Sequence, residues 1–441
     1  MKSQPNTSRS ISKNAKKEKG LSSPSNGGLK KPSSGIAENV GENSMSGWET
    51  CTIPDSLVKN KAGRKHQIPA KDIATEGAFP VIDQGQDFIA GYCNDQSKVI
   101  DFDLPLIIFG DHTRCFKYIN FPFVIGADGT KVLLPNKEFY DPKFYYFALL
   151  ALELPNRGYN RHFKTLKERI LPLPPLPEQK KIAHILSTVQ RAIAEQERII
   201  ATTTELKKAL MHKLFTEGLR NEPQKQTEIG PIPESWETPT VESVCTIKAS
   251  AMSYKQLEDA PNVPDGIHVI GIKVSDMNLP GNEIEFRSAN LERRLSEKEA
   301  LKRTVPEDSI VFPKRGAAIA TNKKRLTTGR TVLDPNLIAV MPSESVNHRY
   351  LFHWFNTFDL KKITDPGPTP QLNKKDIAPL EFPMPSIEEQ KAIAAAIDSA
   401  EEKTTLQTRK RNTLQDLFHT LLHDLMTAKI RVHKLELQHE H

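Results

Sequence analysis

One long stretch of this sequence occurs twice, and this repeat constrains the fold more than any other feature. Residues 170–220 return as residues 381–431 at a constant offset of 211 positions, without a gap. The paired positions include Pro172 with Pro383, Pro174 with Pro385, Glu178 with Glu389, Gln179 with Gln390, Ile182 with Ile393 and Leu214 with Leu425. A repeat of this length indicates two equivalent structural elements in one chain.

Each copy of the repeat has the pattern of a proline-rich segment followed by a long helix. The prolines hold the backbone extended, and Glu178 or Glu389 then stands in the first turn of the helix. Residues spaced alternately four and three apart run from Ile182 to Leu214, and most are apolar, which is typical of a coiled-coil seam. The seam is polar in the middle of both copies, so we expect antiparallel pairing of middle with middle. At about 1.5 Å per residue, each seam would be roughly 50 Å long.

The composition is that of an ordinary globular protein. At 441 residues the chain is long enough for about three domains. No apolar run approaches the roughly 18 residues that span a bilayer, and the N-terminus lacks the apolar core of a signal peptide. The four cysteines lie far apart and form no Cys-x-x-Cys pair. We therefore expect reduced thiols, no zinc site and a cytoplasmic location.

The net charge of +7 is weak support for nucleic-acid binding, because most of it lies in one segment. Residues 1–44 hold eight Lys and Arg against three Glu, and almost no apolar residues. We expect this segment to be a disordered basic tail. It could be solvated, could steer DNA, or could precede a true start at Met45. Any DNA-binding argument must therefore come from local clusters of basic residues.

The rest of the chain alternates two globular segments with the two long helices. Predicted strands at 79–82 and 106–109 and a helix at 141–154 give the first globule a mixed α+β character. Strands at 269–272 and 309–312 and a helix at 347–357 do the same for the second. The predicted boundaries are a globule at 45–175, a helix at 176–220, a linker at 221–235, a globule at 236–386, a helix at 387–430 and a C-terminal tail at 431–441.

Motifs of catalysis are absent from the sequence. It holds no phosphate-binding loop, no Gly-rich dinucleotide turn, no Asn-Pro-Pro-aromatic stretch of amino-methyltransferases and no His or Cys cluster at metal-ligand spacing. We therefore predict no catalytic residue, no metal ligand and no cofactor in this chain.

Two polar loops of the first globule are candidates for DNA contact. Arg, Asn and hydroxyl side chains can donate to phosphates and to the edges of bases. The candidate residues are Asp111, His112, Thr113 and Arg114 in one loop and Tyr159, Asn160, Arg161 and His162 in the other. Two other interpretations stay open for Asp111 and His112, which could form a buried hydrogen-bonded pair or half of a nucleophilic triad. No Ser or Cys elbow accompanies them.

The second globule offers two further candidate loops. A turn of small residues flanked by cations lets the backbone approach a phosphate chain. The candidate residues are Lys314, Arg315, Thr321, Asn322, Lys323, Lys324 and Arg325, followed by Thr369, Gln371 and Lys374. The alternative is a solvated run of charges.

Together these stretches resemble the specificity subunits of type I restriction-modification systems. The proline-rich lead-in at 171–183 looks like the central conserved region of that family, and residues 383–391 look like its C-terminal counterpart. Residues 109–114, 158–162, 316–325 and 367–372 are similar to motifs of its target-recognition domains. The resemblance covers about residues 46–430. The N-terminal 44 residues depart from the family pattern and leave the true start open.

The resemblance implies two mixed α/β target-recognition domains separated by two long antiparallel helices in a pseudo-two-fold repeat. Each domain would read one half of a bipartite DNA site, and the helices would set the spacer. Such a subunit is non-catalytic. It docks modification subunits, two by expectation, which methylate adenine from S-adenosylmethionine, and these recruit restriction subunits that use ATP and Mg²⁺.

Two rival classes of function remain at this stage. A coiled-coil adaptor without DNA recognition would show no salt-sensitive DNA affinity even with partners present. A stand-alone nuclease would cleave DNA with magnesium when isolated. The basic loops disfavour the adaptor, and the lack of a paired acidic site disfavours the nuclease.

Overall fold

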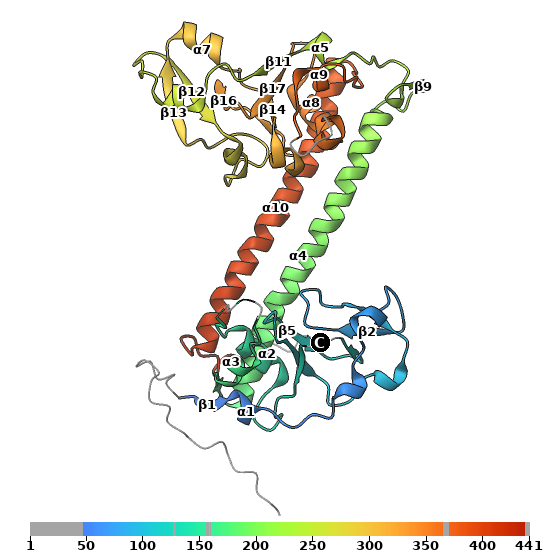
Figure 1. The fold of residues 1–441 in the computed structure, drawn as a ribbon, viewed down its shortest axis with the longest axis vertical. Coiled ribbons are helices and arrows are strands. Elements are labelled where there is room, and N and C mark those ends of the chain that lie inside the picture. Colours follow the sequence, from blue (N-terminus) through green and yellow to red (C-terminus); the bar gives the residue numbers. More distant parts are fainter. Residues whose placement is uncertain (1–46, 127–128, 156–157, 159, 365–369, 437–441) are drawn as a thin grey trace, which may run out of the picture. The chain divides into compact units, whose positions relative to one another are not determined.

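The computed structural model describes residues 47–436 apart from 127–128, 156–157, 159 and 365–369. Contacts divide the chain into two compact units (Figure 1). The first unit comprises Met1–Ser187 and Thr420–His441, and the second comprises Thr188–His419. Each long helix therefore contributes to both units. The predictions for residues 1–44 and for a start at Met45 lie outside the described residues.

The first unit is built on two three-stranded sheets. One has the order β5-β4-β7 and is antiparallel, and the other has the order β3-β2-β6, with β2 and β6 parallel. A separate pair joins β1 to β8. Its elements are β1 (Glu49–Thr52), α1 (Ile53–Ser56), η1 (Arg64–His66), η2 (Ala70–Asp72), β2 (Phe79–Ile82), β3 (Gly91–Cys93), η3 (Gln96–Lys98), β4 (Leu106–Gly110), β5 (Phe116–Ile119), β6 (Val124–Ile125), β7 (Thr130–Leu133), α2 (Pro142–Leu150), α3 (Phe163–Lys167) and β8 (Ile170–Leu173).

The second unit repeats this layout with a different sequence. An antiparallel sheet has the order β11-β17-β14-β15, and a second sheet has the order β13-β12-β16, with β12 and β16 parallel. Its elements are β9 (Gln224–Thr227), β10 (Gly230–Pro233), α5 (Val241–Val244), β11 (Cys245–Ala249), α6 (Tyr254–Glu258), β12 (Ile267–Ile272), η4 (Val274–Asn278), β13 (Leu291–Leu295), α7 (Glu297–Arg303), β14 (Ile310–Pro313), η5 (Gly316–Thr321), β15 (Arg325–Leu326), β16 (Thr331–Leu333), β17 (Leu337–Pro342), α8 (His348–Phe355), η6 (Leu360–Ile363) and α9 (Lys374–Ile377).

The predicted strands form at the predicted places, while two predicted helices end earlier. Helix α2 ends at Leu150 and not at 154, because Pro155 favours an extended residue before it. Helix α8 ends at Phe355, with Asn356 as its C-cap. The predicted linker at 221–235 contains the β9–β10 hairpin. Ile232 of this hairpin is buried in the core of the second unit, which explains why the segment is ordered.

The two long helices are α4 (Leu176–Thr216) and α10 (Ile387–Met426). Every predicted seam position on both helices is buried or half-buried. In the second unit, Gln196 Nε2 donates to Gln407 Oε1 at 2.7 Å, and Lys207 pairs with Glu401. The partner's number falls as the number on α4 rises, so the helices run antiparallel there (Figure 1). The predicted pairing of polar middle with polar middle is confirmed.

The repeated Gln residues attach each globule to its long helix in the same way. The side-chain oxygen of Gln179 accepts from the backbone N of Asp141, the N-cap of α2, at 2.8 Å. Gln390 makes the same contact with Asn347, the N-cap of α8, also at 2.8 Å. Both amides also donate to proline carbonyl groups, Pro174 at 2.8 Å and Pro385 at 2.9 Å. The repeat therefore preserves a docking contact.

Candidate nucleic-acid interface

The two candidate loops of the first unit lie together, joined by Asp111. Its side chain is 2% exposed, and Oδ1 accepts from the backbone N of Phe163 at 2.8 Å. Its carbonyl oxygen accepts from the backbone N of His162, also at 2.8 Å. Asp111 and His162 are both buried, so their role here is to hold the two loops side by side.

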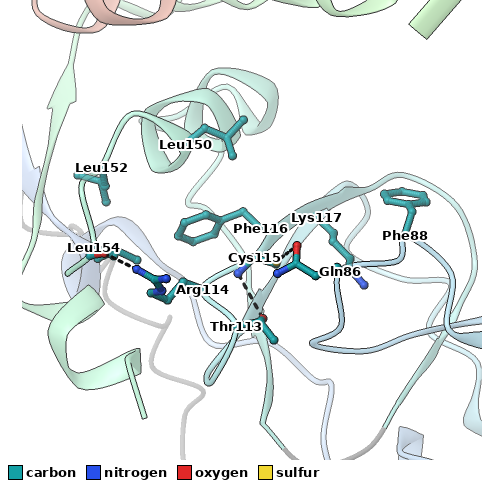
Figure 2. Close-up of a pocket in the computed structure, with 10 residues that line it drawn as sticks. All are labelled: Gln86, Phe88, Thr113, Arg114, Cys115, Phe116, Lys117, Leu150, Leu152 and Leu154. Carbon is teal, nitrogen blue, oxygen red and sulfur yellow. Dashed lines mark hydrogen bonds between the residues drawn. The ribbon is translucent and has the colours of Figure 1, made fainter. Parts of the chain in front are cut away.

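The turn after β4 is fixed in a single shape by hydrogen bonds to the segment around Gln84. The backbone N of His112 donates to Gln84 Oε1 at 3.2 Å, and the Thr113 hydroxyl donates to the Gln84 carbonyl. A Cβ at Gly110 would lie 2.1 Å from Thr113 Oγ1, so only glycine fits there. Arg114 has a positive φ of 63° and donates from Nη1 to the Leu154 carbonyl at 2.8 Å (Figure 2). His112, Thr113 and Arg114 are all half-buried.

Exposed residues complete the candidate surface of the first unit. Asn160 and Arg161 are exposed just before α3, so both side chains can reach a ligand in solvent. Tyr159, which was predicted with them, lies outside the described residues.

The candidate loops of the second unit also meet, through backbone bonds. The N–H of Gly316 donates to the Pro370 carbonyl at 2.9 Å, and that of Leu372 donates to the Lys314 carbonyl at 2.9 Å. Gly316 has a φ of 67°, a conformation that favours glycine. Arg315 and Gln371 face each other across this bridge, and both are exposed. Exposed Lys374 follows at the start of α9, while Thr369 lies outside the described residues.

Basic side chains of the stretch at 321–325 form hydrogen bonds that fix its conformation. Lys324 is 2% exposed and donates from Nζ to Asn322 Oδ1 at 2.9 Å and to the Phe358 carbonyl at 3.1 Å. Burial lowers the pKa of Lys324 to about 8, against a smaller opposing effect of Asp359. Arg325 donates to the Met277 carbonyl at 3.1 Å. Thr321 is exposed, and Lys323 donates to Asn278 Oδ1. Lys324 thus stabilises the loop from beneath, and contact of these residues with DNA stays a prediction.

Comparison with known proteins identifies the type of chain that carries these paired loops. The sequence model described as "Type I restriction modification DNA specificity domain" matches residues 45–203 and 233–416. Each match holds one globular segment and most of the long helix that follows it, as the internal repeat requires. The chain belongs to the type I restriction-modification DNA specificity family.

Individual relatives agree with the family assignment. The specificity subunit of the type I restriction enzyme MjaVIII of Methanocaldococcus jannaschii is 25% identical over 424 residues, covering 88% of this chain and 94% of the relative. That of EcoR124I/EcoR124II of Escherichia coli is 21% identical over 379 residues, covering 82% and 89%. The solved S subunit from M. genitalium has the same fold, with a TM-score of 0.53 at 16% identity, over 89% of this chain and 98% of that one.

The specificity chain is therefore the DNA-recognition component of a type I restriction-modification system and is non-catalytic by itself. Among the residues that the structure describes, no group of three or more His, Cys, Asp or Glu is placed to hold a metal ion. Within the same described ranges, no helix is long and apolar enough to cross a membrane.

An ion network lies next to the 321–326 segment of the second unit, and sequence reasoning missed it. Asp398 on α10 accepts from His353 Nε2 at 2.7 Å and pairs with Arg349 on α8. Arg349 also donates to Glu285 Oε1 at 3.1 Å. Glu285 lies beside β15, since Leu326 N donates to the Ile284 carbonyl at 2.8 Å. The network connects the long helix of the specificity chain to the 321–326 segment.

The charges of this network keep Asp398 ionised. Burial by itself would raise the pKa of Asp398, but hydrogen bonds from His353 and Arg349 outweigh it and lower that pKa to about 2. One sequence signal could have revealed the site. At the offset of the repeat, Asp398 corresponds to Ser187, so a charge appears in one copy only.

Proposed function

We propose that each unit of this specificity chain reads one half of a bipartite, asymmetric DNA site. The observation that carries the proposal is that each unit joins its own two candidate loops into a single surface, through Asp111 in the first and through the bridge at Arg315 in the second. Both units attach to the long helices through the same Gln contact, while their loops differ in sequence. Two different surfaces on one repeated scaffold suit two different half-sites.

The exposed groups suit both parts of DNA recognition. Arg161, Arg315 and Lys374 can neutralise phosphates, and this contribution would weaken steeply with salt. Arg can also bind the O6 and N7 atoms of guanine, and Asn and Gln can bind adenine. Among the candidate residues, Asn160 and Gln371 are exposed amides, one on each surface.

We further propose that the helices dock two modification subunits, which supply adenine methylation from S-adenosylmethionine and recruit the ATP- and Mg²⁺-dependent restriction subunits. Leu206 on α4 is 65% exposed and Leu417 on α10 is 44% exposed. These residues correspond at the offset of the repeat and lie outside the seam. Equivalent apolar positions on two helices favour two copies of one partner. The complex would act in the cytoplasm, where its DNA lies.

The decisive experiment is to express the chain with its modification subunit and to map methylated adenines in the host genome. The expected result is a split motif, with two short half-sites around a fixed gap. A continuous motif would mean that only one unit reads DNA. No methylation despite a stable complex would favour the adaptor function.

A second experiment tests whether the helices set the spacer. Seven residues inserted into both helices beside Gln196 and Gln407 would lengthen each helix by about 10 Å. At about 3.4 Å per base pair, the unread gap should grow by roughly three base pairs. An unchanged gap in a folded, active complex would refute this role of the helices.

A further inference from the structure

A pocket of the first unit lies beside the candidate loop and contains residues that none of the motifs includes. Its volume is about 560 Å³. Figure 2 shows the residues that line it. One wall is apolar and formed by Phe116, Leu150, Leu152 and Leu154. The other wall is polar and includes Gln86 and Thr113, with Phe88 beside them. An apolar wall that faces hydrogen-bonding groups suits a flat aromatic ring with a polar edge.

The segment that carries Gln86 and Phe88 presents unusual side chains to solvent. Phe88 is 48% exposed, and its ring contacts that of Phe121 edge-on with centroids 6.1 Å apart. Gln86 is also exposed. A large aromatic side chain at half exposure contributes little to a core, but it is suited to contact with a base face or a thymine methyl group.

This segment is fixed to the candidate loop at several points. Besides the two bonds of Gln84, the Cys115 thiol donates to Gln86 Oε1 at 3.1 Å and Lys117 Nζ donates to the Asp87 carbonyl. A surface held in place before binding loses less freedom when a ligand arrives. Residues 84–88 are therefore bonded to the turn at 112–113 and to Cys115 and Lys117 that follow it.

The polar wall of the pocket combines neutral groups with two cations that already have partners within the chain. Lys117 is 5% exposed, and its charge faces Asp83 at 3.6 Å. Burial lowers the pKa of Lys117, and Asp83 opposes this effect. The guanidinium of Arg114 is bonded to the Leu154 carbonyl. The amide, hydroxyl and thiol groups that line the polar wall are neutral partners, which match the edge of a base.

We propose that Gln86 and Phe88 are specificity-determining residues that contact the bases of the half-site read by the first unit. The Gln86 amide hydrogen-bonds to a base edge, adenine being the base that Gln recognises through N6 and N7, and Phe88 packs against a base face or methyl group. This inference rests on the proposed function and deepens it.

The test uses the full chain in complex with its modification subunit. The variants are Gln86→Glu, which should shift preference at one position toward cytosine, and Phe88→Ala, which should relax one position. Methylated adenines are mapped, and binding is competed with duplexes that carry single substitutions. We expect roughly a tenfold loss of discrimination at one position of the first half-site. The half-site read by the second unit should be unchanged.

Ile89→Ala is the matched control, because Ile89 is 37% exposed beside Phe88 but does not line the pocket. It should retain the wild-type motif. If a variant still recognises the second half-site as the wild type does, the variant is folded. If Phe88→Ala is unstable, Gln86→Glu alone tests the inference. Wild-type recognition of both half-sites by both variants would overturn the inference alone. A wild-type complex without a split motif would overturn the proposed function and this inference together.

Discussion

The same glutamate of the repeat is bound differently in the two units. In the first, Glu178 accepts from Trp48 Nε1 at 3.1 Å, from two nitrogens of Arg431 at 2.9 Å and from Val432 N at 3.3 Å. In the second, Glu389 accepts from Leu219 N at 3.0 Å and lies 3.4 Å from Arg220 Nε. No described residue accepts from Trp236 Nε1, although that atom is buried.

Where the globule packs on its long helix, the second unit instead has the stronger polar contacts. The second unit uses the partly buried network of Asp398, Arg349 and His353. Lys143 and Arg349 are each the second residue after the N-caps of α2 and α8, and the ammonium of Lys143 lies 4.1 Å from the ring centroid of Tyr118. The comparison teaches that the repeat preserves the places of attachment, while the chemistry at each place is free to differ. Of these two sites, the first unit is bonded more strongly at Glu178 and the second at Asp398.

The largest expected effect comes from removing the better-bonded glutamate. Glu178→Ala would leave Trp48 Nε1 and Val432 N without their acceptor and separate Arg431 from its partner. We expect a loss of about 3 kcal/mol of stability, because each buried unsatisfied donor costs about 1–3 kcal/mol. Thermal or denaturant unfolding measures the change.

Glu389→Ala is the matched variant for this comparison. It removes one backbone contact and a longer ion pair, so we expect a loss of about 1 kcal/mol. Equal losses of stability for the two variants would show that the additional hydrogen bonds of Glu178 do not stabilise the protein.

Acid should weaken the second junction through protonation of Asp398. Because the pKa of Asp398 in the folded protein, about 2, lies below its unfolded value of about 3.9, its stabilisation is present above pH 4 and is lost as pH falls toward 2. The contribution at neutral pH is about 2.6 kcal/mol. Unfolding of the wild type and of Asp398→Asn should therefore differ most above pH 4 and converge near pH 2. A difference that does not depend on pH would contradict this account.

A smaller effect should distinguish the two candidate DNA-binding surfaces. Arg315→Ala should weaken recognition of one half-site about tenfold, which is about 1.4 kcal/mol, if Arg315 contacts a base. Arg161→Ala should do the same for the other half-site. Methylome mapping and competition binding show which half of the motif changes. If both variants affect the same half, the assignment of one surface to each half-site is wrong.

The smallest effect concerns the place where the two copies of the repeat meet. Gln196 and Gln407 are equivalent residues that bond to each other in the seam. Replacing both with Leu should raise stability by about 1 kcal/mol, because polar seam residues fix register at the expense of stability. The single variants should destabilise, since each leaves one amide without its partner. A destabilised double variant would contradict this explanation.

Sequence alone was sufficient for the repeated elements. The constant offset predicted two long helices, and the polar seam at Gln196 and Gln407 predicted their antiparallel pairing. The strand at 106–109 was clear from its apolar run between Pro105 and Gly110. These features depend on local pattern and on periodicity, both of which are visible in a linear sequence.

Contacts between distant residues could not be predicted in this way. Nothing local marks Gln84 as the support of the turn at His112, or Arg349 as the partner of Asp398. Burial of Lys324 depends on Phe358, which lies 34 residues away. Which charges of the predicted basic cluster face solvent is decided by tertiary packing, and its contact with DNA stays a prediction. The linker-like composition of residues 221–235 likewise did not predict the β9–β10 hairpin. The segment has few apolar residues, but one of them, Ile232, is buried in the core of the second unit.

The makeup of the first unit has a consequence for synthesis. It needs Arg431 and Val432 from the far end of the chain, since both bind Glu178. More than two hundred residues of the second unit are made in between. At about 5–20 residues per second, the ribosome would need roughly ten seconds to one minute for them. The second unit can thus complete its fold first, although it is translated later. Until residues 431–432 are made, Glu178 of the nascent first unit lacks its contacts with Arg431 and Val432.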